Sequence, residues 1–303
     1  MQPLVSIVMP VYDTERYLPA AVKSVLSQSY ANWELLVICD ESPGDTRSAM
    51  ASFIDPRIRF MEHRNGGPAY TRNQGMRESR GDLIAFLDSD DLWAADKLAK
   101  QVTLFESDPA VGVVYSQRKT IDENGNCIDG FRPRLYSGWI LDRLYVDNFV
   151  CMSSVVMRRA VLVKVGFLDE RLRMSEDFDY WLRAACFFPF AFVDEPLVSY
   201  RIHGDQVSRQ TEVRIKTVWE IRERFDRNYG KYVGYWARRR AKALHFSHKA
   251  YRGEASMPRA RIMADYLRAL NWYPLDGFSW RGMARVAAPR MVVQWYRKMR
   301  RGA

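Results

Sequence analysis

The chain has 303 residues, of which 48% are hydrophobic, so it can bury a sizeable core, and these values exclude a disordered chain. Its net charge of +10 is uneven, because residues 1–200 carry −6 and residues 201–303 carry +16, and this division indicates two regions with separate tasks. The longest apolar stretch without a charge, residues 184–193, is about half as long as a bilayer span and contains Pro189, so we expect no segment that crosses a membrane.

Strand and helix patterns alternate over residues 4–117. Almost continuously apolar runs predict buried strands, and apolar residues at helical spacing predict helices between them. In chain order, the strands are expected at residues 4–12, 33–39, 57–62, 82–88 and 111–117, and the helices at 14–27, 46–54, 68–79 and 94–106. This alternation indicates an α/β fold with a mostly parallel, Rossmann-like sheet flanked by helices.

The pattern changes after residue 119. A hairpin-like region around "ENGN" leads into mixed segments, and the end of the chain is helical in pattern and rich in Lys and Arg. We therefore expect two regions, an α/β domain over residues 1–210 and a basic helical extension over residues 211–303.

The four cysteines have no CxxC pair and no zinc-ligand spacing, which favours buried thiols in a reducing compartment over disulfides. They are Cys39, Cys127, Cys151 and Cys186. The opening "MQPLVSIVMPVY" runs directly into a strand pattern and does not resemble a secretory signal. These observations predict a cytoplasmic protein.

Three carboxylates follow the fourth expected strand in the segment "FLDSDDLW": Asp88, Asp90 and Asp91. Ligands of parallel sheets bind beyond the carboxyl ends of the strands, where Tyr12 and Asp40 are also expected. Part of the cluster could cap a helix, since Asp and Ser are favoured there. The close charges favour instead a site for Mg²⁺ or Mn²⁺ that is completed by the phosphates of a substrate.

A second acidic group stands in "MSEDFDYWLRA". Ser175 is expected to cap a helix whose first turn contains Glu176 and Asp177. An ordinary helix start would explain the segment. The alternative is that one of the two acids is a general base that deprotonates an acceptor hydroxyl.

Taken in order, "PLVSIVMPVYDTERYLPAAVKSVLSQSYANWELLVICDES", "NGGPAYTRNQGMRESRGDLIAFLDSDD", "SEDFDYWLRA" and "VDEPLVSYRIHGDQVS" are similar to family 2 of the glycosyltransferases, of the bacterial surface-polysaccharide type. The resemblance covers residues 3–210. It implies the GT-A fold, a nucleotide-sugar donor, a divalent cation (Mn²⁺ or Mg²⁺) and transfer that inverts the anomeric configuration.

On the donor side, the resemblance places Pro10 and Tyr12 around the nucleotide base and Asp40 at the imide N–H of uracil. Arg72 corresponds to the arginine beside the diphosphate. The sequence departs from the family pattern around Asp40, since Cys39 stands where a second acid is common and Glu41 stands where glycine is common. The choice of base is therefore less firmly implied than the diphosphate contact.

On the metal side, the resemblance makes Asp88 the ribose-facing member of the D-x-D motif and also a metal ligand. Asp90 is the main metal ligand, and His203 completes the metal site. Asp91 is implied to belong to the nucleotide-sugar site, either in a supporting position behind the residues that contact the donor or facing the acceptor. Asp177 corresponds to the catalytic base, with Glu176 as its neighbour.

The basic end of the chain predicts a surface helix. In "APRMVVQWYRKMRRGA" one face is apolar, with Met291, Val292, Trp295, Tyr296 and Met299, and the other is basic. Such a helix suits peripheral contact with an anionic membrane, on the inner face of the plasma membrane, and a helical subdomain packed on the core is the alternative. No nucleic-acid recognition motif is present.

Two other functions stay open at this point. A nucleotidyltransferase can share the fold and the metal chemistry, but it does not explain "SEDFDYWLR". A silent sugar-nucleotide or glycan-binding module would not need the clustered acids. We therefore predict a transferase that acts on a saccharide or a polyprenyl-linked saccharide, most simply from a UDP-sugar.

Overall fold

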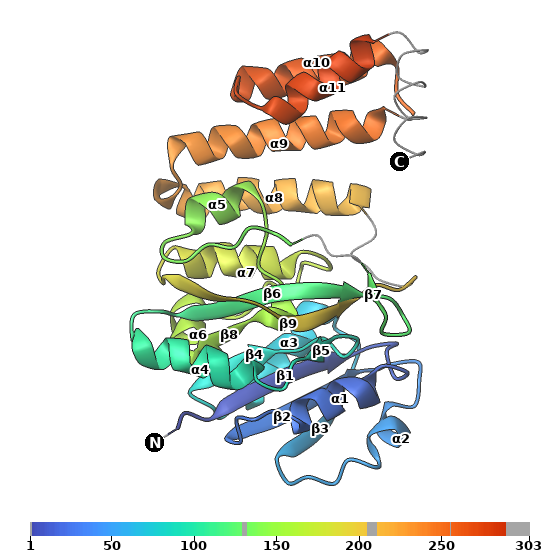
Figure 1. The fold of residues 1–303 in the computed structure, drawn as a ribbon, viewed down its shortest axis with the longest axis vertical. Coiled ribbons are helices and arrows are strands. Elements are labelled where there is room, and N and C mark those ends of the chain that lie inside the picture. Colours follow the sequence, from blue (N-terminus) through green and yellow to red (C-terminus); the bar gives the residue numbers. More distant parts are fainter. Residues whose placement is uncertain (1, 129–131, 205–210, 255, 289–303) are drawn as a thin grey trace. The chain divides into compact units, whose positions relative to one another are not determined.

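The computed structural model describes residues 2–128, 132–204, 211–254 and 256–288 (Figure 1). The chain divides into two compact units. The first comprises Met1–Leu144 and Asn148–Tyr229, and the second comprises Tyr145–Asp147 and Gly230–Ala303. Helix α8 (Thr211–Tyr229) lies in the first unit, and the boundary predicted at residue 210 stays a prediction.

The first unit is built on one mixed sheet in the order β3-β2-β1-β4-β8-β6-β9-β5, with β7 paired to β6. The predicted alternation is confirmed in its first half. The elements there are β1 (Val5–Val11), α1 (Leu18–Leu26), β2 (Trp33–Asp40), α2 (Thr46–Met50), β3 (Ile58–His63), α3 (Pro68–Glu78) and β4 (Leu83–Phe86). Strands β1 to β4 are all parallel, and in this register Val5 lies beside both Trp33 and Leu83.

The second half of the sheet contains both strand directions. Its elements are β5 (Leu92–Trp93), α4 (Lys97–Ser107), β6 (Val113–Ile121), β7 (Cys127–Ile128), α5 (Leu141–Val146), a 3₁₀ turn at Met152–Ser154, β8 (Val156–Arg158), α6 (Arg159–Val165), α7 (Glu176–Ala185) and β9 (Phe190–Arg201). Strand β6 is parallel to β9 and antiparallel to β8. The predicted hairpin is confirmed, since β6 and β7 pair antiparallel around "ENGN".

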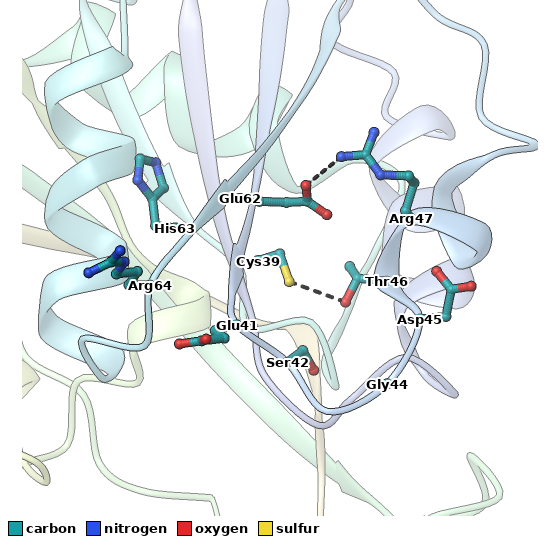
Figure 2. A pocket seen from close by; sticks show the side chains of 10 residues that line it. All are labelled: Cys39, Glu41, Ser42, Gly44, Asp45, Thr46, Arg47, Glu62, His63 and Arg64. Atoms are coloured by element: carbon teal, nitrogen blue, oxygen red, sulfur yellow. Dashed lines mark hydrogen bonds and ion pairs between the residues drawn. The ribbon is translucent and has the colours of Figure 1, made fainter.

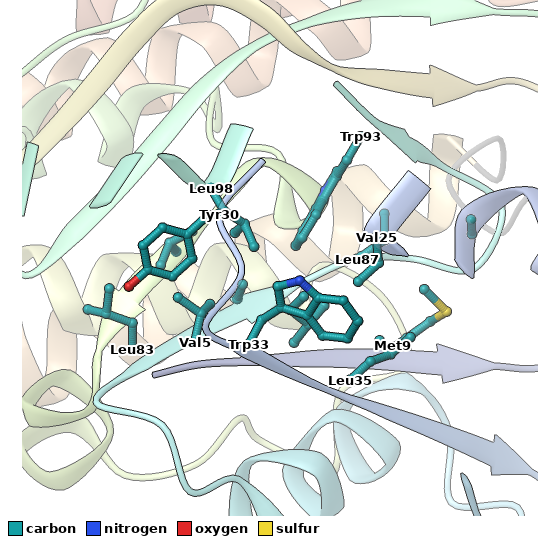
Figure 3. Close-up of a cluster of buried hydrophobic side chains, with 14 of the residues drawn as sticks. Val5, Met9, Val25, Tyr30, Trp33, Leu35, Leu83, Leu87, Trp93 and Leu98 are labelled. Carbon is teal, nitrogen blue, oxygen red and sulfur yellow. The ribbon is translucent and has the colours of Figure 1, made fainter. Parts of the chain in front are cut away.

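Strand β1 is almost fully apolar because helices cover both of its faces. Val5, Ile7, Met9 and Val11 belong to a core cluster that contains side chains of α1 and α4 (Figure 3). On the other face, α3 lies against Val8. A Cβ atom on Gly75 would come within 2.6 Å of Ile38 Cδ1 and would collide with Val8, so only glycine permits this close approach of α3 to the sheet.

The second unit is helical, as predicted. A 3₁₀ turn (Gly230–Tyr232) precedes α9 (Tyr235–Gly253), α10 (Arg259–Trp272) and α11 (Gly277–Ala287). These helices pack around Ala250, Ile262, Tyr266 and Val286. The amphipathic face predicted at 291–299 lies outside the described residues.

The prediction of four buried thiols is wrong at Cys127. This cysteine is exposed, as both residues of the short strand β7 are. Among the helices that the structure describes, none is sufficiently long and apolar to span a membrane.

Candidate active site

The carboxyl ends of β1, β2 and β4 meet at one edge of the sheet, because these strands are parallel neighbours. Asp13 after β1, Glu41 after β2 and Ser175 before α7 have φ angles of 55°, 51° and 59°. Among the described residues they are the only non-glycine positions with positive φ. Left-handed backbone at such residues costs free energy and is concentrated at functional sites, so this edge is the candidate site.

Asp40 is buried at the end of β2, and its carboxylate holds the loop in front of α3. Its two oxygens accept hydrogen bonds from the backbone N–H groups of Gly66 (2.8 Å) and Gly67 (2.9 Å). Glu41 accepts a third bond from the N–H of Asn65, at 3.1 Å. Each Asp40 oxygen keeps a second lone pair, so the predicted contact with a uracil imide remains chemically feasible and stays a prediction.

A cavity of about 530 Å³ opens beside these residues, at the ends of β2 and β3 (Figure 2). It is lined by Cys39, Glu41, Ser42, Gly44, Asp45, Thr46, Arg47, Glu62, His63 and Arg64. Cys39 and Glu41, the two departures from the family pattern, both face this cavity. Tyr12 after β1 is 52% exposed, so its ring has a free area that could stack on a flat ligand. Pro10 lies one strand position before the end of β1.

Arg72 joins two acidic groups that are far apart in the sequence. From α3 its guanidinium donates to Asp88 Oδ1 and to Glu176 Oε1, both at 2.5 Å. Burial opposes the charge of Arg72, but the carboxylates of Asp88 and Glu176 outweigh burial and raise the pKa of Arg72 above its usual value. The predicted donor-side and base-side residues are therefore brought together by one side chain.

Asp90 and His203 are also brought together. Oδ2 of Asp90 lies 3.0 Å from Nε2 of His203, and the histidine ring packs 5.3 Å from the ring of Tyr17. Two cis ligands of one octahedral Mg²⁺ or Mn²⁺ ion are about 3 Å apart, so this pair fits a shared cation. The described residues contain no group of three or more His, Cys, Asp or Glu side chains that could hold a metal ion. Substrate oxygens and water would therefore supply the remaining ligands.

Asp91, the next residue after Asp90, is buried. Its Oδ1 accepts a hydrogen bond from the backbone N–H of Arg201, at 2.9 Å. Burial, and then the charges of Asp90 and Asp88, raise the pKa of Asp91 well above its usual value. A divalent cation would relieve this accumulation of negative charge, which agrees with the fit of the Asp90–His203 pair.

Arg201 is a site residue that the sequence analysis missed. Its Nε donates to the carbonyl oxygen of Asp90 (2.8 Å), and its Nη1 donates to the carbonyls of Asp122 and Glu123. Its guanidinium also lies 4.5 Å from the Tyr17 ring centre. The sequence offered one signal for Arg201, its position two residues before His203 in "RIH". The carbonyl groups that Arg201 contacts belong to loops that no local sequence pattern connects.

Asp177 lies in the first turn of α7, as predicted. Its Oδ2 accepts from Nδ2 of Asn148 at 3.2 Å, and its Oδ1 accepts from the N–H of Phe178 at 2.7 Å. Burial and the neighbouring charge of Glu176 raise its pKa to about 6, although Arg72 acts in the opposite direction. A carboxylate with this pKa is suited to accept a proton near neutral pH.

Two details around α7 differ from the sequence analysis. Ser175 occupies the N-cap position, but its side chain makes no capping hydrogen bond, because its backbone is left-handed. Asn148 was not predicted. It is 29 residues from Asp177 in the chain, and the sequence contains no periodicity that would connect them.

Comparisons with known proteins identify the family of the chain. The model of "Glycosyl transferase family 2" matches residues 6–166. The Escherichia coli protein named UDP-Glc:alpha-D-GlcNAc-diphosphoundecaprenol beta-1,3-glucosyltransferase WfgD is 30% identical over 221 residues, which cover 72% of this chain and 85% of that protein. An uncharacterized glycosyltransferase of Rickettsia conorii is 33% identical over 201 residues, 66% of this chain and 33% of that protein, so the chain spans about a third of that longer relative.

Solved structures support the fold. The structure of S. aureus TarS 1–349 in complex with UDP-GlcNAc has a TM-score of 0.58 at 16% identity, covering 97% of this chain and 91% of that one. The mannosyltransferase PcManGT from Pyrobaculum calidifontis, in complex with GDP-Man and Mn²⁺, also has a TM-score of 0.58 at 16% identity, covering 100% of this chain and 80% of that one. With the family match over more than half of its length, the chain belongs to glycosyl transferase family 2 and is a glycosyltransferase of the GT-A fold.

Proposed function

We propose that the protein transfers a sugar from a UDP-sugar to a hydroxyl of a saccharide or a polyprenyl-linked saccharide, with a divalent cation and with inversion of the anomeric centre. The observation that carries the proposal is the double contact of Arg72 with Asp88 and Glu176. This contact connects the position expected for the diphosphate with helix α7, which contains the expected catalytic base Asp177. The name of WfgD, which includes UDP-Glc and a diphosphoundecaprenol acceptor, supports the same donor and acceptor classes.

On the donor side, the proposal assigns the base to the edge formed by Pro10, Tyr12 and Asp40. The half-exposed ring of Tyr12 can stack on uracil, and Asp40 can accept its imide N–H. Arg72 would exchange its bond with Asp88 for the diphosphate, because a guanidinium binds phosphate oxygens in the same paired manner as carboxylates.

Asp90 and His203 are proposed to hold the divalent cation, with Asp88 and the diphosphate oxygens beside them. When bound, the cation neutralises the charge that develops on the leaving diphosphate. Asp91 is buried and is held by Arg201, so it would orient Asp90 instead of touching the sugar. PcManGT is in complex with Mn²⁺ as well as GDP-Man, which favours Mn²⁺ as the cofactor.

Asp177 is proposed as the base. Its carboxylate accepts the proton of the acceptor hydroxyl while that oxygen forms a bond to the anomeric carbon. The bond from this carbon to the diphosphate oxygen breaks at the same time, and the diphosphate leaves on the opposite face. One displacement of this kind inverts the configuration, and Glu176 keeps Arg72 in place between the two sides.

The proposed location is the cytoplasm, with peripheral contact to the inner face of the plasma membrane. The proposed catalytic region is 1–210 and the basic helical region is 211–303. A lipid-linked acceptor would be reached at that surface.

Product analysis tests the function. The protein is incubated with Mn²⁺, a panel of UDP-sugars and lipid-extracted acceptors, and the nucleotide products are separated by ion exchange. The proposal expects one UDP per transferred sugar, release that stops with EDTA, and inverted configuration by NMR. Release of pyrophosphate, or metal-independent transfer, would contradict it.

A further inference from the structure

The second unit is unusually basic. Residues 230–303 contain seventeen Lys or Arg residues and three Asp or Glu residues. A strong positive charge of this kind favours association with an anionic partner.

One end of this unit is formed by three segments: the start of α9, the end of α10 and the start of α11 (Figure 1). Arg239 near the start of α9 donates to the carbonyls of Asn271 and Trp272 at the end of α10. Trp280 in α11 donates through Nε1 to the carbonyl of Pro274, at 2.8 Å. The three segments are therefore linked by hydrogen bonds.

Large aromatic and apolar side chains gather at this end, which we call the aromatic end. It comprises Tyr232, Tyr235, Trp236, Trp272, Tyr273, Leu275 and Trp280. Trp236 is 63% exposed and Leu275 is 79% exposed, and Tyr232, Tyr235 and Trp280 are exposed as well. The rings of Tyr235 and Trp236 contact each other edge to face, with centroids 5.3 Å apart. Exposed apolar groups in one place mark an interaction site.

Basic side chains are interleaved with these rings. Lys242 lies 4.1 Å from the ring centre of Trp272, Lys231 lies 5.1 Å from that of Tyr232, and Arg240 lies 5.6 Å from that of Tyr273. Within residues 230–242 and 271–281 the single acid is Asp276. Its carboxylate accepts from the N–H groups of Phe278 and Ser279 at the start of α11. The aromatic end is therefore positive.

We propose that the aromatic end is a docking surface for an anionic lipid membrane. Trp and Tyr place an apolar ring and a polar group at the boundary between acyl chains and headgroups, and Lys and Arg attract anionic headgroups. This combination distinguishes a membrane from a protein partner, whose interface would favour fewer lysines. The inference rests on the proposed function, since it gives the enzyme access to a lipid-linked acceptor. It lies in residues other than the basic amphipathic segment predicted at 288–303.

The test measures co-sedimentation of the full chain with vesicles, without nucleotide or acceptor. One set of vesicles contains phosphatidylglycerol in phosphatidylcholine, and the other contains phosphatidylcholine alone. The wild type is expected to bind the anionic vesicles and to lose binding as salt increases. Trp236→Ser with Trp280→Ser, and separately Arg240→Glu with Lys231→Glu, should each weaken binding at least about tenfold.

Trp139→Ser is the matched control, because Trp139 in the first unit is 68% exposed and its loss should leave vesicle binding unchanged. Circular dichroism checks that every variant is folded. Equal binding of wild type and both double variants would overturn the proposal. A second result would also overturn it: the wild type does not bind vesicles but forms a concentration-dependent dimer, and the double variants lose this dimer. The occupant of the surface would then be a second copy of the chain. Because no substrate is present, the result is independent of the UDP-release assay.

Discussion

Nε2 of His203 lies 3.0 Å from Oδ2 of Asp90, although 113 residues separate them in the chain. The contact exists because β9 ends beside the loop that follows β4. Arg201, two residues before His203, is bonded to that same loop through its backbone and its side chain. The geometry of the proposed cation site therefore depends on Arg201 as well as on the two ligands.

Arg201→Met should destabilise the protein by about 3 kcal/mol, because the carbonyl oxygens of Asp90, Asp122 and Glu123 all lose their charged donor. Urea unfolding of the full chain measures the change in the free energy of unfolding. The stability of Arg201→Lys should fall between those of the wild type and Arg201→Met, since one ammonium group cannot reach all three carbonyl oxygens. Arg171→Met, at an exposed arginine paired with Asp169, should cost less than about 1 kcal/mol. Equal losses in both methionine variants would contradict the role assigned to Arg201.

The activity should fall on the acid side with an apparent pKa near 6. The pKa of Asp177 is raised to about 6, so its proton is held below that pH and the base is inactive. The rate should fall about tenfold per pH unit below 6, whereas an ordinary Asp would lose activity only near pH 4. A pH profile of kcat at saturating donor checks this, and a rate that is flat down to pH 5 would exclude Asp177 as the base.

Asn148→Ala should move that acid limb to higher pH. The amide of Asn148 donates to Oδ2 of Asp177 and favours the charged carboxylate, so removing the amide raises the pKa further. Glu176, which raises this pKa, and Arg72, which lowers it, are unchanged in the variant. A lower rate with an unshifted profile would mean that Asn148 only supports its loop.

Asp177→Asn should keep the protein folded. A raised pKa means that the folded state binds the proton more tightly than the unfolded chain. This contribution to stability is complete below the unfolded pKa of about 4 and is lost as the pH rises through about 6. At pH 8 the neutral asparagine should therefore raise the free energy of unfolding by on the order of 1–2 kcal/mol or leave it unchanged. A marked loss of stability at pH 8 would show that the carboxylate has a structural role instead.

Arg72→Lys should lower kcat/KM by about a hundredfold, because an ammonium cannot bond Asp88 and Glu176 together and cannot pair with a diphosphate. Arg77→Lys on the same helix is the matched control, since Arg77 is exposed and its contacts are with Glu170 at 3.4 Å and with the ring of Phe167, not with the proposed site residues. Comparable activity of the two lysine variants would remove Arg72 from the proposed site.

The parallel half of the sheet could be predicted from the sequence because each strand there is a separate apolar run with a helix on either side. The residues after β1, β2 and β4 could be grouped for the same reason, since parallel strands end at one edge. The antiparallel strands β5 and β8 are two and three residues long, too short to form a pattern. Arg201 and Asn148 could not be found because their contacts connect loops that are far apart in the chain.

The proposed chemistry requires that Asp90 and His203 hold a cation that binds a nucleoside diphosphate. A thermal-shift panel of UDP, dTDP, GDP and CDP, each with Mn²⁺, Mg²⁺ or EDTA, measures this binding on the wild type, Asp90→Ala and, as a control, the exposed-site variant Arg171→Met. Ligand that binds only the folded protein raises the midpoint by mass action. We predict a shift for UDP with Mn²⁺ or Mg²⁺ that EDTA and Asp90→Ala abolish and that Arg171→Met retains. A UDP shift that persists in EDTA and in Asp90→Ala, or no shift with any nucleotide, would contradict the proposed cation site.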